Sequence, residues 1–365
     1  MELEIPHFHE NAKSLKLSSA ENDLVRQKIL ECEGTSGVQT IVLARGDLAE
    51  EDSKVNDYRN KIHADYDGIV LCKEVFPDPP IRGRFGEAFI PLVEGATPQR
   101  AKTFRQFGIK NEAMLKITQQ WEDCKFIEKP TDLHNEWCSQ AFAVPKKSST
   151  FPWRGVVDMR GPNSQTRMCG YPLPSIEETL VSQGKNMIFS ILDLRQAFHQ
   201  MPLAPSSRHI TCTYTPKGVY QWRVNVMGLK NASIQFQRMM DDVLSPVADV
   251  ADCYIDDIIV GSKVEEGEDL YVQHDKDLRR VFQVLRENKL VVDISKCRLF
   301  VPEVEFCGHI LGGVVRRPAP GQLSAIEKWE VPTTITELRS FLGFANYYSS
   351  YVKDSAEVAA FCRKN

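Results

Sequence analysis

The chain has 365 residues, of which 42% are hydrophobic and 26% are charged, as in a globular protein large enough for several lobes. It has no apolar run of 18 residues and no signal-peptide pattern at the N-terminus, so we expect an intracellular protein without a membrane anchor. The ten cysteines show no C-x-x-C pair and no zinc-finger spacing, which fits a reducing compartment and argues against a structural zinc.

The net charge of −4 is unevenly distributed along the chain. Residues 1–95 contain 11 Lys and Arg against 18 Asp and Glu, whereas residues 96–365 contain 34 against 31. The first segment has short apolar runs at 40–44 and 68–72 and a Pro-rich stretch at 77–80, but no aspartic-protease motif. We therefore expect an acidic leader or linker of unknown role, followed by a mildly basic body that permits contact with phosphates.

Apolar periodicity predicts alternating helices and strands in the first half of the body. The expected helices cover 110–129 (ended by Pro130), 176–180, a turn-helix at 195–200, and 232–244. The expected strands cover 140–144 and 153–158 around a basic loop, 187–194, and the paired runs 210–214 and 219–224.

The second half adds a strand–turn–strand at 253–261 and an amphipathic helix with the apolar stripe Leu278, Val281, Phe282 and Leu285. Two capping-box patterns, Ser324-x-x-Glu327 and Thr334-x-x-Glu337, predict helix starts. The whole pattern indicates an α+β fold, with helices on one face of a mostly antiparallel sheet.

The stretch around Asp256 and Asp257 organises this interpretation. The two adjacent acids lie at the tip of the predicted hairpin, and Asp193 ends another buried strand. Asp is a common turn residue, which is the plainer explanation of the pair. If the strands are neighbours, however, three carboxylates meet at one rim of the sheet, a ligand set suited to Mg²⁺. From the acids alone, nucleotidyl transfer and metal-dependent nuclease chemistry are both open.

Eight blocks of sequence resemble, in order and spacing, those of reverse transcriptases from Gypsy-type LTR retrotransposons and, more distantly, retroviruses. The resemblance extends from Ala96 to Tyr351. Its blocks are VPKK…WRGVVDMRGPN, YPLP, FSILDLRQAFHQMPL, NVMGLKNASIQFQRMMDDVL, YIDDIIVGS, LRENKL…SKC, VEFCGHIL and ELRSFLGFANYY. The family identification implies a Pol polyprotein domain with a right-hand fold of fingers, palm and thumb, in which an antiparallel palm sheet is backed by helices.

The resemblance implies that Asp193, Asp256 and Asp257 are catalytic and hold two Mg²⁺ ions, with Mn²⁺ as an alternative. Asp193 and Asp256 would be the main ligands and Asp257 a peripheral one. Tyr254 belongs to the same tyrosine-x-Asp-Asp turn and would face the substrate. Phe198 falls at the family's aromatic sugar gate, which selects deoxynucleotides, although a core Phe on a short helix is the alternative.

Further substrate contacts follow from the same resemblance. Lys146 and Arg154 correspond to the residues that clamp the triphosphate, with two solvated loop charges as the alternative. Met227 and Gly228 match the segment that lines the nucleotide pocket, and Gln235–Gln237 begin the helix behind it. Lys296 lies where the family has a lysine that can protonate the leaving pyrophosphate, but a surface lysine is the preferred interpretation.

The primer grip is expected at Cys307, Gly308 and His309, where a core strand is nearly as good an interpretation. Val226, Met227 and Ser233 depart from the family's usual residues, two of them at positions that are commonly Pro, which bears on fidelity and rate. The fingers are expected at 96–166 and 201–231, the palm at 167–200 and 232–313, and the thumb at 314–365. The thumb is expected to end before any ribonuclease H domain.

The implied reaction is RNA-directed DNA polymerisation, in which dNTPs extend a DNA or RNA primer on an RNA or DNA template. A decayed retroelement relic that only binds nucleic acid is the alternative, and an RNA-dependent RNA polymerase and a nuclease are further rivals. We expect a cytoplasmic location, or packaging in retroelement particles, and no membrane partner. The oligomeric state is not predicted.

Overall fold

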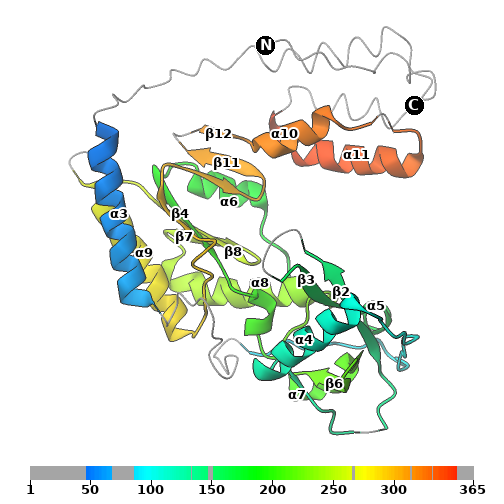
Figure 1. Cartoon of the computed structure of the whole chain (residues 1–365). Coiled ribbons are helices and arrows are strands. Elements are labelled where there is room, and N and C mark those ends of the chain that lie inside the picture. Colours follow the sequence, from blue (N-terminus) through cyan, green and yellow to red (C-terminus); the bar gives the residue numbers. More distant parts are fainter. Residues whose placement is uncertain are drawn as a thin grey trace. The chain divides into compact units, whose positions relative to one another are not determined.

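The computed structural model describes residues 47–67, 86–132, 134–146, 151–264, 268–312, 315–330 and 332–351 (Figure 1). The apolar runs noted at 40–44 and 68–72 and the Pro-rich stretch at 77–80 therefore lie outside the described residues. Among the described residues, 52–304 and Gly312 form one compact unit, and 47–51, 305–311 and 315–351 form the other.

A four-stranded antiparallel sheet is the centre of the larger unit. Its order is β7 (Ala251–Tyr254), β8 (Asp257–Ser262), β4 (Ile188–Asp193) and β9 (Arg298–Val301). The strands β4 and β8 are mostly apolar and lie in the middle of the sheet. Side chains on both of their faces are buried, which is why neither strand alternates between apolar and polar residues. The predicted strand at 187–194 and the predicted hairpin at 253–261 are both confirmed.

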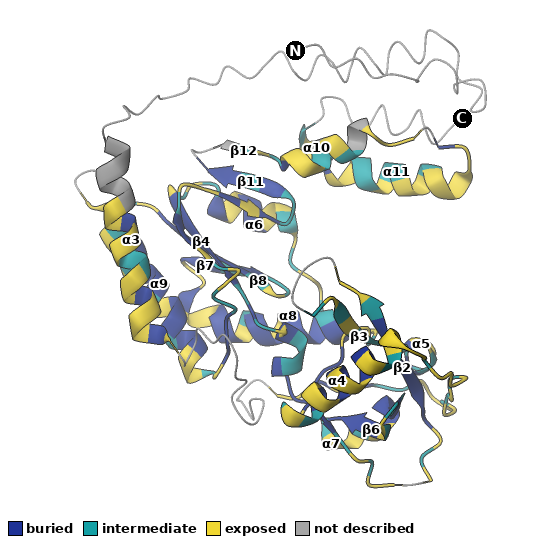
Figure 2. Ribbon diagram, viewed as in Figure 1, coloured by how far each residue is buried: buried dark blue, intermediate teal, exposed yellow. Residues whose placement is uncertain are grey.

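Helices cover this sheet. Helix α8 (Ala232–Leu244) packs on β7, and α9 (Leu270–Glu287) packs on β8 and β4. The predicted apolar stripe of α9 is fully buried, as Figure 2 shows for the inner side of this helix. Asp269 caps α9 by accepting hydrogen bonds from the backbone N–H groups of Tyr271 and Val272. The shorter α6 (Ile176–Gln183) precedes β4.

The helix α3 (Asp47–Tyr66) lies alongside α9 and was not predicted (Figure 1). Tyr66 stacks on Phe282 with ring centroids 4.9 Å apart, and the Arg59 guanidinium donates to the Leu299 carbonyl at 2.9 Å. Part of the acidic N-terminal segment is thus a helix that contacts α9 and the edge strand β9.

A second sheet, also in the larger unit, has the order β1 (Ile127–Glu128), β6 (Gly218–Trp222), β5 (Thr213–Thr215), β2 (Ser139–Pro145) and β3 (Trp153–Val157). The predicted pairing of the strands around Pro216–Gly218 is confirmed, but the predicted start of the first strand at residue 210 is wrong, because His209–Thr211 form a 3-10 helix and β5 begins at Thr213. Helix α4 (Ile109–Asp123) covers β2 and β3. Its predicted end at Pro130 is wrong, because Lys125 adopts a left-handed φ of +57° and the chain continues into β1.

Among the described residues of the larger unit, five helical segments of three to five residues lie between the longer helices and strands. They are α5 (Arg160–Ser164), η2 (Ala197–Gln200), α7 (Pro205–Arg208) with η3 (His209–Thr211), and η4 (Ser245–Val247).

A three-stranded sheet has the order β10 (Glu303–Phe306), β11 (His309–Gly312) and β12 (Val315–Pro318), and most of its residues belong to the smaller unit. The same unit contains α10 (Pro320–Glu327), α11 (Ile335–Tyr347) and η5 (Ser349–Tyr351). The capping box at Thr334 and Glu337 is confirmed, with both reciprocal hydrogen bonds present. The one predicted at Ser324 is wrong, because α10 already begins at Pro320, a favourable first helical residue. None of the helices in the described ranges is both long and apolar enough to cross a membrane.

Candidate active site

The tip of the β7–β8 hairpin is held in a strained conformation by a buried glutamine. Ile255, between the two strands, has a φ of +59°, which is costly for a β-branched residue. Its backbone N–H donates to Gln237 Oε1 at 2.6 Å, and Gln237 Nε2 donates to the Cys253 carbonyl at 3.0 Å. Gln237 is fully buried on α8, so it fixes the turn that presents Asp256.

The strand register brings three aspartates to one end of the sheet. Asp193, the last residue of β4, pairs directly with Asp257, the first residue of β8. The backbone N–H of Leu194 donates to the Asp256 carbonyl at 3.3 Å, which places Asp256 beside the end of β4 as well. The backbone therefore brings Asp193 and Asp256, which are 63 positions apart in the sequence, to the same edge of the sheet, as the sequence predicts.

The three carboxylates repel one another. Burial, followed by the negative charges of Asp256 and Asp193, raises the pKa of Asp257 to about 6. Desolvation and the charge of Asp193 raise the pKa of Asp256 too, although its side chain is exposed at the turn. Such a cluster of raised carboxyl pKa values in a strand-end site is typical of functional sites, and it is relieved by a bound cation.

Lys296 supplies a positive charge at this site. Its Nζ lies 2.9 Å from Asp193 Oδ1 and 3.9 Å from Asp293 Oδ2. Partial burial opposes protonation, but the hydrogen bond to Asp193 and the surrounding carboxylates outweigh it and raise the pKa of Lys296. The lysine is thus part of the carboxylate cluster rather than an isolated surface charge.

The donor set fits a divalent cation in its chemistry. Three carboxylates at the ends of β4 and β8 and on the turn before β8 are hard oxygen ligands. Their mutual repulsion, which Lys296 offsets only in part, favours further positive charge between them. Across the described ranges, no group of three or more His, Cys, Asp or Glu side chains is already arranged as a ligand cage. Mg²⁺ does not need one, because it uses one or two carboxylates and completes its shell with water and substrate phosphates.

A buried polar network supports the two strands that carry the acids. His274 of α9 hydrogen-bonds Ser190 Oγ of β4 at 2.8 Å through Nε2 and Ser262 Oγ of β8 at 2.9 Å through Nδ1. The Ser262 hydroxyl donates to Asp277 Oδ2 at 2.7 Å. His274 is completely buried, and desolvation lowers its pKa to about 3, so it is neutral in the folded protein.

Phe198 lies on η2, just beyond the end of β4. Its ring packs edge-on against Phe236 of α8, with centroids 5.5 Å apart, and the side chain is half-buried. The ring is therefore anchored on one side by the core while part of it stays accessible, an arrangement compatible with a sugar gate and with a core Phe alike.

Lys146 and Arg154 belong to one β-hairpin of the second sheet. Val144 pairs with Arg154, and the Lys146 backbone N–H donates to the Pro152 carbonyl at 2.8 Å. Both side chains are exposed. The strand β3 fits tightly over α4 at Gly155, where a Cβ would lie 2.7 Å from both Ile117 Cγ2 and Trp121 Cη2.

Met227 and Gly228 occupy a loop held by Asn163 of α5. Met227 is 61% exposed, and Gly228 has a φ of +98° that other residues avoid. Asn163 Nδ2 donates to the Gly228 carbonyl at 2.7 Å, and Asn163 Oδ1 accepts from the Lys230 backbone N–H at 2.8 Å. A side chain 65 residues away thus closes this turn.

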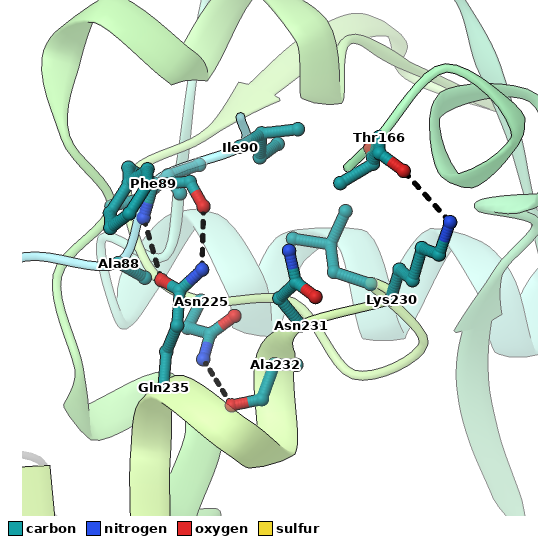
Figure 3. Close-up of a pocket in the computed structure, with 11 residues that line it drawn as sticks. Ala88, Phe89, Ile90, Thr166, Asn225, Lys230, Asn231, Ala232 and Gln235 are labelled. Atoms are coloured by element: carbon teal, nitrogen blue, oxygen red, sulfur yellow. Dashed lines mark hydrogen bonds between the residues drawn. The ribbon is translucent and has the colours of Figure 1, made fainter. Parts of the chain in front are cut away.

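A small pocket lies beside the same loop (Figure 3). Gln235 binds both backbone groups of Phe89 from one side, at 2.8 and 2.7 Å, and Lys230 Nζ donates to the Thr166 carbonyl from the other. Asn225 Nδ2 donates to the Ala232 carbonyl at 3.3 Å. The side-chain amides of Gln235 and Asn225 thus form hydrogen bonds with the protein's own backbone. These bonds hold the segment at Phe89 and the loop before α8 in place.

The Cys307–Gly308–His309 turn joins β10 to β11 in the smaller unit. Cys307 and Gly308 have φ values of +47° and +78°. The Tyr347 hydroxyl donates to the Cys307 carbonyl at 2.6 Å, and His309 Nδ1 bonds the Tyr351 hydroxyl at 2.8 Å. The turn is therefore an ordered hairpin braced by aromatic residues of α11 and η5.

Two supporting side chains were missed by sequence reasoning, which treated Gln237 only as part of a helix start and did not single out Asn163. Their signals would have been a polar residue on the buried face of α8 and an Asn directly after the Pro of a short helix. Neither signal points to a partner that is remote in sequence.

A family model described as "Reverse transcriptase (RNA-dependent DNA polymerase)" matches residues 144–311. The chain is 31% identical over 340 residues to the Retrovirus-related Pol polyprotein from transposon opus of Drosophila melanogaster, covering 89% of this chain and 32% of that protein. It is 34% identical over 231 residues to the corresponding polyprotein from transposon gypsy, covering 63% of this chain and 21% of that protein. The chain thus spans a third or less of these relatives.

Among solved structures, the foamy viral protease-reverse transcriptase dRH in complex with ds DNA resembles this fold with a TM-score of 0.69 at 18% identity. The match covers 93% of this chain and 55% of that one. The expected α+β right-hand polymerase fold, with an antiparallel sheet backed by helices, is therefore confirmed.

Proposed function

Since this chain carries a reverse transcriptase domain of the retrotransposon Pol type, we propose that it is an RNA-directed DNA polymerase. It would extend a primer 3′-hydroxyl with dNTPs on an RNA or DNA template, as a nucleotidyltransferase. The observation that carries this proposal is the register pairing of Asp193 with Asp257, beside Asp256, inside the matched region.

Asp193 and Asp256 would hold two Mg²⁺ ions, with Asp257 contributing from the edge. When bound, such ions lower the pKa of the attacking hydroxyl and neutralise the charge of the triphosphate. Asp257, with a pKa raised to about 6, gains the most from a neighbouring positive charge. Lys296, whose Nζ lies 2.9 Å from Asp193 Oδ1, would donate its proton to the leaving pyrophosphate.

The incoming nucleotide would be held by the Lys146–Arg154 hairpin and by the loop at Met227 and Gly228. A compact ammonium and a planar guanidinium on one rigid hairpin suit a triphosphate, and their exposure leaves both available. Phe198, fixed by Phe236, would exclude the ribose 2′-hydroxyl, and Tyr254 precedes the acid turn on β7.

The template and primer would be bound chiefly through backbone phosphates, so affinity should fall steeply with salt. The foamy viral relative was solved with ds DNA, which supports a duplex as ligand. The Cys307–His309 turn would hold the primer terminus through its backbone. We place this activity in the cytoplasm or in retroelement particles.

The main rival is a relic that keeps the fold and binds nucleic acid without catalysis. The full set of acids, the hairpin cations and the Phe198 ring count against such decay. An RNA-dependent RNA polymerase would share the acids but would not need Phe198, and a nuclease would need neither Phe198 nor the hairpin cations.

Incorporation of dTTP on poly(rA)·oligo(dT) with Mg²⁺ tests the proposal. The native chain should extend the primer, Asp256→Asn should lose all but a trace of activity, and the exposed surface variant Asp242→Asn should match the native rate. Retained binding with no incorporation above the Asp256→Asn level would select the relic. Equal use of rNTPs and dNTPs would select the RNA polymerase.

A further inference from the structure

Helix α3 contacts β9, the edge strand of the sheet that carries the acids, and the proposed chemistry gives this helix no role. Its residues 52–66 belong to the same compact unit as that sheet (Figure 1). The helix lies outside the residues 144–311 that the family model matches. Ile62 is fully buried and Val55 is buried too, so one side of the helix is firmly docked. Its contacts with β9 are therefore a fixed part of this unit.

Strand β9 contains a β-bulge opposite β4. Phe189 pairs with Val301 and Ile191 pairs with Arg298, so three steps along β9 lie opposite two steps along β4. Within the bulge, Phe300 has a φ of +53°, which is strained for a bulky residue. Such a conformation persists only where the surrounding structure holds it, and strained positions cluster near functional sites.

The bulge is held from two sides. From β4, Ser190 Oγ accepts a hydrogen bond from the Phe300 backbone N–H at 3.1 Å. From α3, Arg59 donates through Nε to the Leu299 carbonyl at 2.9 Å and through Nη2 to the Phe300 carbonyl at 3.4 Å. The Tyr58 ring stacks on the Phe300 ring, with centroids 5.4 Å apart. An arginine suits this place because its planar guanidinium can donate to two neighbouring carbonyls at once.

The bulge sets the register of the residues that lie beside the acids. A bulge shifts the strand pairing on one side of it by one residue, and such a shift turns side chains to the other face. The residues before the bulge follow the end of β4: Val292 bridges Leu194, and the Asp293 N–H donates to the Asp193 carbonyl at 2.8 Å. In this register Lys296 Nζ lies 2.9 Å from Asp193 Oδ1. The place of Lys296 thus depends on the bulge.

We infer that Arg59 is a positioning residue for the carboxylate site. By holding the bulge from α3, it keeps Lys296 beside Asp193, without touching substrate itself. Loss of the guanidinium would deprive two carbonyls of these donors and leave the left-handed Phe300 with less support, so the bulge would relax. The catalytic consequence rests on the proposed polymerase function, whereas the effect on the bulge does not.

The variant Arg59→Met tests the inference, because methionine keeps the apolar stem of this half-buried side chain but has no N–H donor. The matched control Asp65→Asn weakens another contact of α3, the 2.6 Å ion pair with Arg279 of α9, and does not touch the bulge. With dTTP on poly(rA)·oligo(dT), Arg59→Met should lower kcat about tenfold and change the KM for dTTP by less than about twofold. Asp65→Asn should keep the native kcat. A native kcat in Arg59→Met would overturn the inference.

A double-mutant cycle separates positioning from a general loss of stability. If Arg59 acts through Lys296, Arg59→Met should lower kcat by less than about twofold in the Lys296→Ala background, against about tenfold in the native one. General destabilisation would lower kcat by the same factor in both backgrounds. Equal factors in the two backgrounds would therefore contradict the inference.

Amide hydrogen exchange, followed by mass spectrometry, gives a readout that needs no activity. In Arg59→Met the amides of residues 293–300 should exchange about tenfold faster than in the native chain, whereas those of residues 278–285 in α9 should keep the native rate. Asp65→Asn should leave residues 293–300 unchanged. Native exchange at 293–300 in Arg59→Met, or an equal acceleration in α9, would overturn the inference.

The two readouts distinguish this inference from the proposed function. A native chain that incorporates no dTTP would refute the polymerase proposal. The exchange rates of residues 293–300 would still decide whether Arg59 holds the bulge.

Discussion

Acidification should destabilise this protein through His274, whose network joins the two strands that carry the acids. In the folded state His274 is neutral and bonded to Ser190 and Ser262, and its pKa is lowered to about 3 by burial. In the unfolded chain a histidine titrates near pH 6.5. Asp277 also faces the network, through Ser262.

The sign follows from proton binding. Because the folded pKa of His274 is below the unfolded value, the unfolded state binds more protons between these two pH values. The stabilisation is complete above about pH 6.5 and is lost as the pH falls toward about 3. At about 1.36 kcal/mol per pH unit, this one residue should cost roughly 2.7 kcal/mol of unfolding free energy between pH 6.5 and 4.5.

The assay is urea unfolding of the native chain and of His274→Gln at pH 7 and pH 4.5. The variant should be less stable at pH 7, because it breaks buried hydrogen bonds, but it should lose roughly 2.7 kcal/mol less than the native chain on acidification. Carboxyl groups such as Asp257 contribute equally to both proteins and cancel in this difference. An identical pH dependence of the two proteins would refute the reasoning.

Three further outcomes follow from the site. Phe198→Ala should lower discrimination between dNTPs and rNTPs by about tenfold or more in steady-state incorporation, and unchanged discrimination would leave the ring a core residue only. Lys146→Ala should raise the KM for dNTP about tenfold with a small change in kcat. A lower kcat with an unchanged KM would argue against a contact between Lys146 and the triphosphate. Gly155→Ala should lower the unfolding free energy by about 1–3 kcal/mol, because the added Cβ would clash with Trp121. Gly170→Ala, whose Cβ would point into open space, should change the unfolding free energy by less than about 0.5 kcal/mol. Equal effects of the two substitutions would contradict the close packing of β3 on α4.

Local patterns in the sequence predicted the elements that carry the site. The two short apolar runs on either side of Asp256 and Asp257 predicted the β7–β8 hairpin, the stripe beginning at Leu278 predicted α9, and the capping box at Thr334 predicted the start of α11. These elements were predictable because each is specified by residues within one or two turns or strands of each other. The end of α4 was not, because Lys125 takes a left-handed conformation that its sequence does not demand.

The supporting contacts of the site were not predictable from the sequence. Gln237 holds the Ile255 turn from 18 residues away, and Asn163 closes the Gly228 turn from α5. Such partners depend on how helices pack on sheets, which no local pattern encodes. Helix α3 was missed for a related reason, since its charged sequence has only a narrow apolar face and its pairing with α9 is a tertiary contact.

The most direct test of the central claim, that Asp193 and Asp256 hold divalent cations, is Mn²⁺ binding followed by electron paramagnetic resonance. The chain would be bound to a dideoxy-terminated primer–template with the matching dNTP, and free Mn²⁺ would be titrated. We predict two bound ions for the native chain and for Asp242→Asn, and loss of at least one ion for Asp193→Asn and for Asp256→Asn. Equal Mn²⁺ binding by all four proteins would contradict the account.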